Sequence, residues 1–300
     1  MSSGRRSSDV PLSGSIPSIT LRCSTDPKEC HHREEFVKKE SISEIKNRFN
    51  DCNEGGLSAF IATYQDDDRA GVRALIERAK KKLEALQIER ERLQGMRFFE
   101  DKYSAEASLI CGIDEAGRGP LAGPVVAGAV ILAPGDEILW LNDSKKLSAR
   151  KREELYDVIM EKAVSVGVGM ASPAEIDAVN ILKATYLAMR RAISDLNVIP
   201  DMLLNDAVVI PEVPIRQVGI VKGDQKSVSI AAASIIAKVT RDRIMQDYDE
   251  EYPGYSFAVH KGYGTGGHYE AIRELGPCPI HRMTFLKSMT QSTGAGHAGQ

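Results

Sequence analysis

Hydrophobic positions recur at two different spacings along this 300-residue chain, and the spacing changes near residue 105. From residue 41 to about 97, apolar residues such as Ile42, Ile45 and Phe49 return every three or four positions, which predicts amphipathic helices. A second stripe of this spacing comprises Val72, Ile76, Ala79, Leu83, Leu86 and Leu93. The other faces mix basic and acidic residues, which favours a solvated surface over a phosphate-binding one.

Beyond residue 105 the apolar residues gather into short β-rich runs separated by turns and helical stretches. Strands are expected at residues 109–113, 125–132, 164–170, 202–206 and 215–221. Helices are expected over 150–163 with Ser148 as cap, from a capping box at Ser172 to about residue 195, and over 227–250. We summarise this as strand-strand-strand-helix-helix-strand-strand-helix, an α/β fold with a mixed five-stranded sheet flanked by helices. The first two strands are close enough for antiparallel pairing.

Composition narrows the class of protein without naming a function. The formal net charge is −3, with 42% hydrophobic and 27% charged residues, so the chain is not uniformly basic and nucleic-acid binding would need local basic clusters. No apolar run is long enough to span a bilayer, and no secretory signal is visible. Five scattered cysteines do not resemble a disulfide framework, and we expect a cytoplasmic protein.

The pattern divides the chain into four parts. Residues 1–40 are expected to form a disordered tail, and residues 41–104 a helical accessory region that binds substrate in one interpretation. Residues 105–290 form the expected catalytic domain, and residues 291–300 a flexible tail.

Four carboxylates stand at the ends of predicted strands. Asp114 and Glu115 follow the first strand, Asp206 ends the fourth, and Asp224 follows the fifth. Each alone is also typical of a polar turn, but an oxygen-only set suits Mg²⁺ or Mn²⁺ and phosphodiester hydrolysis. Adjacent side chains on a strand point to opposite faces, so Asp114 and Glu115 can share a site only if the strand breaks or twists between them.

The loop after these carboxylates has the sequence Gly117-Arg118-Gly119, whose backbone can approach a sugar or phosphate closely. Its glycine spacing matches neither a dinucleotide fingerprint nor a Walker loop.

Other candidate substrate contacts come from three separate segments. Lys145 lies in the loop Asn-Asp-Ser-Lys-Lys-Leu, which is either an exposed loop or a phosphate site. Lys238 and Arg241 are three residues apart on the last long helix, where they are expected to face a duplex backbone. Tyr263 is flanked by glycines, which suits either stacking on a base or sugar or partial burial under a loop.

These segments together resemble bacterial ribonuclease HII, the type 2 ribonuclease H, over about residues 108–290. The matching pieces appear in the family's order: GIDEAGRGPLAGPVVAGAVIL, NDSKKLS, ASPAEIDAVNILKATYLAMRRA, LLNDA, VKGDQKSVSIAAASIIAKVTRDR, HKGYGTGGH and PIHRMTF. The resemblance implies a ribonuclease H-like fold, hydrolysis of RNA in RNA–DNA hybrids, and incision 5′ of ribonucleotides embedded in DNA. Products would carry 3′-hydroxyl and 5′-phosphate ends.

The resemblance also implies roles for single residues. The family's catalytic carboxylates fall on Asp114, Glu115, Asp206 and Asp224, and we assign Mn²⁺ or Mg²⁺ to the first three. The loop Gly117-Arg118-Gly119 would read the ribose 2′-hydroxyl, the group that separates RNA from DNA. Tyr263 would sense the RNA–DNA junction, while Lys145, Lys238 and Arg241 would contact phosphates.

Two alternatives remain open at this stage. One is type 3 ribonuclease H, which acts poorly on single ribonucleotides; its pattern lacks this glycine-arginine-glycine loop. The other is a non-catalytic nucleic-acid-binding protein, which would gain nothing from four acidic groups facing phosphates. We expect partners to be RNA–DNA hybrids and ribonucleotide-containing DNA, no membrane, and a monomeric protein.

Overall fold

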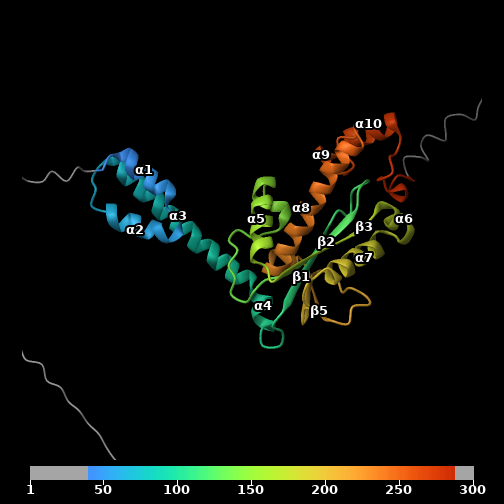
Figure 1. Ribbon diagram of the computed structural model, residues 1–300, viewed down its shortest axis with the longest axis horizontal. Helices are drawn as coiled ribbons and strands as arrows, with labels where there is room; N and C mark the ends of the chain where they lie inside the picture. The colour runs from blue at the N-terminus through green and yellow to red at the C-terminus, as the bar shows by residue number, and fades with distance from the viewer. Residues whose placement is uncertain (1–39, 288–300) are drawn as a thin grey trace, which may run out of the picture.

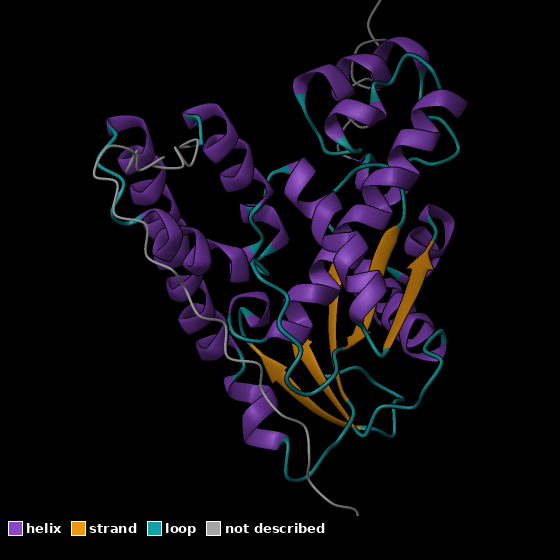
Figure 2. Ribbon diagram, turned by 60° about the vertical axis from the view of Figure 1, so that its left-hand side comes forward, coloured by secondary structure: helices purple, strands orange, loops and turns teal. Residues whose placement is uncertain are grey.

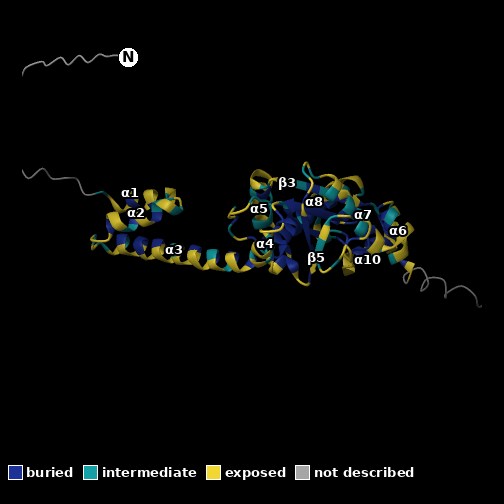
Figure 3. Ribbon diagram, turned by 90° about the horizontal axis from the view of Figure 1, so that it is seen from below, coloured by how far each residue is buried: buried dark blue, intermediate teal, exposed yellow. Residues whose placement is uncertain are grey.

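The computed structural model describes residues 40–287, so the tails expected at both ends lie almost entirely outside it. Its N-terminal helices extend to one side of a layered body in which helices cover a twisted sheet (Figures 1 and 3). Its elements, in chain order, are α1 Ile42–Asp51, α2 Glu54–Tyr64, α3 Ala70–Met96, α4 Phe98–Tyr103, β1 Ile110–Ala116, β2 Val125–Ile131, η1 Ser144–Lys146, α5 Ala149–Lys162, β3 Ser165–Ala171, α6 Pro173–Val179, α7 Ile181–Ser194, β4 Met202–Asp206, β5 Arg216–Ile220, η2 Gly223–Gln225, α8 Val228–Glu251, α9 Phe257–His260, α10 Gly266–Leu275 and η3 Met283–Phe285.

The sheet contains the five expected strands in the order β3-β2-β1-β4-β5. Strands β1, β2 and β3 are antiparallel neighbours, whereas β4 and β5 run parallel to β1. Helices lie on both sides of this sheet (Figure 2). The mixed α/β fold is therefore confirmed, including the antiparallel pairing of the first two strands. No helix among residues 40–287 has the length and apolar character needed to cross a membrane.

Helix α8 approaches one face of the sheet so closely that only glycine fits beneath it. A Cβ on Gly112 of β1 would lie 2.1 Å from the carbonyl carbon of Ser229, and a Cβ on Gly128 of β2 would lie 2.5 Å from the carbonyl oxygen of Ala233. Helix α7 makes the same kind of contact on the opposite face, where a Cβ on Gly169 of β3 would lie 2.1 Å from a helix carbonyl. Close packing of this kind fixes each helix against the sheet.

Two details of the expected element order are wrong. Helix α5, capped by Ser148 as expected, lies between β2 and β3, so the first three strands are not consecutive elements. The helix that starts at Ser172 also does not continue to residue 195 but ends at Val179. Asn180 interrupts it with φ of +72°, and its side chain accepts the backbone N–H groups of Leu182 and Lys183 to start α7. Asparagine favours such capping over a helix interior, which explains the break.

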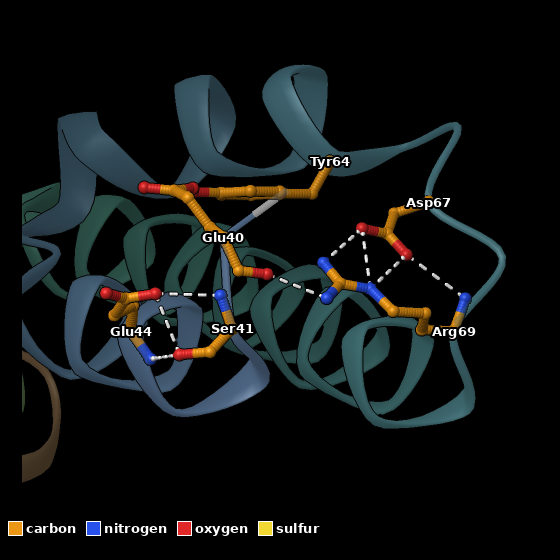
Figure 4. A network of polar contacts seen from close by, with 6 residues as sticks. All are labelled: Glu40, Ser41, Glu44, Tyr64, Asp67 and Arg69. Carbon is orange, nitrogen blue, oxygen red and sulfur yellow. Dashed lines mark hydrogen bonds and ion pairs between the residues drawn. The ribbon is translucent and has the colours of Figure 1, made fainter. Parts of the chain in front are cut away.

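Helices α1, α2 and the first half of α3 enclose a small core of their own, built around Ile45, Leu57 and Val72. A capping box at Ser41 and Glu44 starts α1 (Figure 4). In the same view, the guanidinium of Arg69 donates to the carboxylate of Asp67 and to the backbone carbonyl of Glu40, and the Tyr64 hydroxyl donates to the Glu40 side chain (2.5 Å).

The end of α3 and the short α4 are packed into the body that contains the sheet. Leu93 and Met96 belong to the core between α5 and α8. The guanidinium of Arg92 donates to the backbone carbonyl of Leu141 at 2.5 Å. The carboxylate of Glu100 accepts the Ser227 hydroxyl and a backbone N–H at the start of α8. The accessory helices are thus anchored in the core of the sheet domain.

Candidate active site

Three of the four predicted carboxylates meet at the ends of β1 and β4 and in the turn after β5. The parallel strands β1 and β4 are paired up to the residue before Asp114 and the residue before Asp206, which places these two side chains next to each other on the α8 side of the sheet. The carboxylate of Asp206 accepts the backbone N–H of Gly223 at 2.7 Å. This contact holds the short helix η2, and with it the neighbouring Asp224, against the same strand end.

Glu115 joins this group without the expected break in the strand. Strand β1 stays paired with β2 through Ala116, so the strand continues past both acidic residues. Pairing with β4 has already ended, however, and the side of β1 that faces β4 is open at Glu115. The charge of Asp206 acts on both Asp114 and Glu115, which indicates that both side chains border one region.

Burial and mutual repulsion dominate the electrostatics of the site. Burial raises the pKa of Asp114 well above its usual range, and the charges of Glu115 and Asp206 raise it further. Burial also raises the pKa of Glu115. The pKa of Asp224 rises to about 6, again mainly through burial and then through the charges of two neighbouring aspartates. The site therefore carries more negative charge than its surroundings compensate.

Lys145 is a basic residue that the structure brings close to these carboxylates. Burial lowers the pKa of its ammonium group, but the charges of Asp114, Asp143 and Asp224 more than offset this and raise the pKa. Asp143 was missed by the sequence analysis. It is buried, accepts the backbone N–H of Lys145 at 2.9 Å, and adds to the repulsion at Asp224. Its position in a polar loop gave no sign of this burial.

The glycine-arginine-glycine loop and Tyr263, which were expected to read the 2′-hydroxyl and the RNA–DNA junction respectively, lie close to each other. A Cβ on Gly119 would lie 4.0 Å from a ring carbon of Tyr263, which is half-exposed. Arg118 turns back and its guanidinium donates to the carboxylate of Glu115 at 3.3 Å. The sequence analysis missed Arg282, a fully buried residue that donates to the backbone carbonyls of Gly117 and Arg118.

Arg241 does not occupy the exposed position that was expected. It is 1% exposed, and its guanidinium donates to the backbone carbonyls of Ala122, Pro124 and Lys261 at 2.9–3.1 Å. Burial lowers the pKa of this guanidinium. The expectation that Arg241 contacts phosphates is wrong, because all three guanidinium nitrogens donate to backbone carbonyls inside the protein.

Lys238 remains accessible and pairs with Asp242 at 2.6 Å. It borders a surface hollow of about 500 Å³ together with Arg152, Lys261 and Tyr263. The structure thus places Lys238 near Tyr263 and other basic side chains, on the surface rather than among the carboxylates.

Two family models match this chain. The model described as Ribonuclease HII matches residues 111–288, and the model described as Ribonuclease HII N-terminal domain matches residues 41–104. The first match alone covers more than half of the chain. The chain belongs to the ribonuclease HII family.

Relatives agree with this assignment. The chain is 56% identical to the Ribonuclease HII of Lachnoclostridium phytofermentans over 83% of this chain and 98% of that protein. It is 50% identical to the Ribonuclease HII of Clostridioides difficile over 84% of this chain and all of that protein. The crystal structure of the ribonuclease H2 from Pyrococcus horikoshii OT3 aligns with a TM-score of 0.51 and 27% identity, covering 62% of this chain and 98% of that one. Members of the ribonuclease HII family are ribonuclease H endonucleases that act on RNA–DNA hybrids.

The carboxylates suit a hard divalent cation by their chemistry, although they do not form a closed cage. Among residues 40–287, no three His, Cys, Asp or Glu side chains are arranged closely enough to enclose an ion. The donors are all oxygen atoms, and the raised pKa values of Asp114 and Asp224 reflect burial first and then repulsion from neighbouring carboxylates that a cation would relieve. Asp114, Glu115 and Asp206 therefore fit such an ion as ligands, once their side chains are drawn together.

Replacing Asp224 with Asn should stabilise the metal-free protein at neutral pH. Its raised pKa means that the folded state binds this proton more tightly than the unfolded state, so stability is lost as pH rises from about 4 through about 6. We expect Asp224→Asn to gain on the order of 1–3 kcal/mol at pH 7.5 in EDTA and nothing near pH 4. Urea unfolding at both pH values measures this, and a variant that is less stable at pH 7.5 would contradict the repulsion described above.

Proposed function

We propose that this chain cuts the RNA strand of RNA–DNA hybrids and also incises DNA on the 5′ side of a single embedded ribonucleotide. The products carry 3′-hydroxyl and 5′-phosphate ends. The observation that carries the proposal is the placement of a sugar-reading loop directly after the carboxylate Glu115 and in contact range of Tyr263. One short segment then serves both phosphodiester cleavage and recognition of ribose.

Asp114, Glu115 and Asp206 would hold Mg²⁺ or Mn²⁺, with Asp224 completing the set of catalytic carboxylates. Such a cation supplies activation of water and stabilisation of the leaving oxygen in phosphodiester hydrolysis. The protein's own contribution is to hold the carboxylates at adjacent strand ends, where the backbone N–H of Gly223 fixes Asp206. Lys145 adds a positive charge beside them that suits a substrate phosphate.

The backbone of the loop is oriented for reading a hydroxyl group. The carbonyls of Gly117 and Arg118 point inward, where they accept from Arg282 at 2.6 and 2.9 Å. In a trans peptide the N–H points opposite to the carbonyl, so the N–H groups of Arg118 and Gly119 point away from Arg282. Within residues 40–287 neither has a hydrogen-bond acceptor. These two donors are available to a ribose 2′-hydroxyl, which DNA lacks.

Tyr263 and the hollow beside it suit the flanking DNA. Its half-exposed ring can stack on a sugar or base next to the ribonucleotide. Lys238 and Lys261 border the same hollow and supply positive charge for backbone phosphates. We further propose that the protein acts as a monomer in the cytoplasm, and that the helices of residues 41–104 add to substrate binding.

The decisive experiment compares two substrates in Mg²⁺ and in Mn²⁺. One is a DNA duplex with a single ribonucleotide, and the other is an RNA–DNA hybrid. We expect cleavage of both, with incision 5′ of the ribonucleotide. Cleavage of the hybrid alone would instead favour a type 3 activity, and an all-DNA duplex is the control that should stay intact.

Asp114→Asn should abolish cleavage while leaving hybrid binding intact, because one cation ligand is lost and little shape is changed. Rates should fall by at least about 1000-fold, as expected when a metal-assisted step loses its cation. Mn²⁺ should raise the melting temperature of the unaltered protein but not of the variant, since ligand binding stabilises the folded state. Exposed Asp66 provides the matched control, and Asp66→Asn should behave as the unaltered protein. Full turnover by Asp114→Asn would refute the cation assignment.

Tyr263→Ala should weaken cleavage at a single embedded ribonucleotide more than cleavage of a continuous hybrid. Loss of a stacked ring corresponds to roughly 1–3 kcal/mol, or about 5- to 150-fold in kcat/KM. Tyr263→Phe keeps the ring and should retain most of the rate. Equal rates for Tyr263→Ala and the unaltered protein on the single-ribonucleotide duplex would remove the tyrosine from the recognition site.

A further inference from the structure

A short extended segment near the end of the described chain lies between the two loops that read the substrate. This segment, Ile280–Arg282, pairs with the loop that follows the glycine-arginine-glycine sequence: Gly123 donates its N–H to the Ile280 carbonyl at 2.9 Å, and Arg282 donates its N–H to the Leu121 carbonyl at 2.8 Å. Leu121 in turn donates its N–H to the carbonyl of Gly262, next to Tyr263. The segment is therefore hydrogen-bonded to the first loop directly, and it is linked to the loop of Tyr263 through Leu121.

Two adjacent side chains of this segment point in different directions, as extended backbone requires. Arg282 is fully buried and donates to the carbonyls of Gly117, Arg118 and Gly123. Burial lowers the pKa of its guanidinium to about 9. This planar, forked donor fixes three carbonyls at once, and it thereby turns the N–H groups of the loop outward.

His281 reaches the opposite loop through a second histidine. His268 Nδ1 lies 2.9 Å from the carbonyl oxygen of Tyr263, and His268 Nε2 lies 3.0 Å from His281 Nε2. The backbone N–H of Cys278 is 2.9 Å from His281 Nδ1. Both rings are buried, and burial lowers the pKa of each imidazole, that of His268 to about 4.

Only one arrangement of protons satisfies this chain of neutral rings. Because a carbonyl can only accept, His268 Nδ1 carries the hydrogen and donates to Tyr263, which leaves its Nε2 as an acceptor. His281 must then donate through Nε2 and accept from Cys278 through Nδ1. The carbonyl of Tyr263 is thus held by a directed series of hydrogen bonds that starts at the segment carrying Arg282.

A metal site does not explain these residues. Cys278 lies at the Nδ1 edge of His281 and His268 lies at its Nε2 edge, so the three groups do not share a central point. In the part of the chain that the structure describes, no cluster of His, Cys, Asp or Glu suits an ion. What this arrangement of histidines provides is therefore the series of hydrogen bonds to the carbonyl of Tyr263.

We infer that His281 and Arg282 are positioning residues that set the separation between the sugar-reading loop and Tyr263, and so determine selectivity for a single ribonucleotide flanked by DNA. The inference rests on the proposed function of these two loops. Arg282 fixes the loop at residues 117–119, and His281 fixes Tyr263 through His268. Because the space between Gly119 and the Tyr263 ring would hold no more than an added Cβ, at 4.0 Å from the ring, a small shift of either loop changes that space.

A double-mutant cycle on two substrates tests this inference. His281→Asn should lower kcat/KM on the single-ribonucleotide duplex by about 10-fold, but by less than about 3-fold on a continuous hybrid. The effect on the single-ribonucleotide duplex should largely disappear when Tyr263→Ala is already present, because His281 acts through that residue. Equal losses on both substrates, or a loss that persists in the Tyr263→Ala background, would overturn the inference.

The matched control is Tyr255→Phe. It removes the hydrogen bond from the Tyr255 hydroxyl to the Gly276 carbonyl, and that hydroxyl contacts neither of the two loops. It should not change the ratio of the two rates. If His281→Asn does not fold, Arg282→Lys gives the second test, since a single nitrogen cannot reproduce the fork by which three guanidinium nitrogens donate to the carbonyls of Gly117, Arg118 and Gly123. Its loss in kcat/KM should be larger on the single-ribonucleotide duplex than on the continuous hybrid, and the Mn²⁺ dependence of the rate should stay unchanged. Rates like those of Tyr255→Phe would contradict the inference while leaving the proposed function intact. Failure of the unaltered protein to cut the single-ribonucleotide duplex would overturn both.

Discussion

The contact between α8 and the sheet determines where every part of the active site lies. Gly112 and Gly128 let the helix backbone rest directly on β1 and β2, and neither position tolerates a Cβ without movement of backbone. Helix α8 begins just after Asp224. Farther along, it reaches the glycine-arginine-glycine loop, where Arg241 fills the space that a Cβ on Gly117 would need. With a rise of about 1.5 Å per residue, a rigid helix of this length fixes the distance between the carboxylates and the glycine-arginine-glycine loop.

Helix α8 also contacts the N-terminal helices, and so it connects them to the part of the sheet that carries the carboxylates. Its first backbone N–H groups need acceptors, and Glu100 of α4 supplies one by accepting from Ser229 and from the Ser227 hydroxyl. Met96 and Leu93 pack into the core beneath α8. A cut between the accessory region and the sheet domain would therefore expose core residues and remove an α8 cap, so residues 41–104 contribute to the active-site scaffold whatever they contribute to substrate binding.

Strand ends and their acidic residues could be predicted from the sequence because both depend on local pattern. Alternating or continuous apolar runs indicate strands, and a carboxylate directly after such a run is brought to the sheet edge by the strand itself. Depth within the protein could not be predicted in this way. Lys238 and Arg241 looked equivalent at helical spacing, yet three residues rotate a side chain by about 60° around the axis, which separates a surface position from a buried one. Asp143 and Arg282 were missed for the same reason, since a charged side chain in a predicted loop gives no local sign of burial.

In the proposed function, recognition of the sugar and placement of the catalytic carboxylates share one piece of backbone. Strand β1 stays paired with β2 through Ala116, so it carries Asp114 and Glu115 without interruption into Gly117. Arg118 closes this link from the other side by donating to the carboxylate of Glu115. A ligand that draws the loop's N–H groups outward would also shift Arg118, and with it the charge that balances Glu115. Under the proposed function, cleavage that depends on a 2′-hydroxyl then needs no separate moving part, because only Ala116 lies between Glu115 and the loop that begins at Gly117, and the Arg118 side chain bonds back to Glu115.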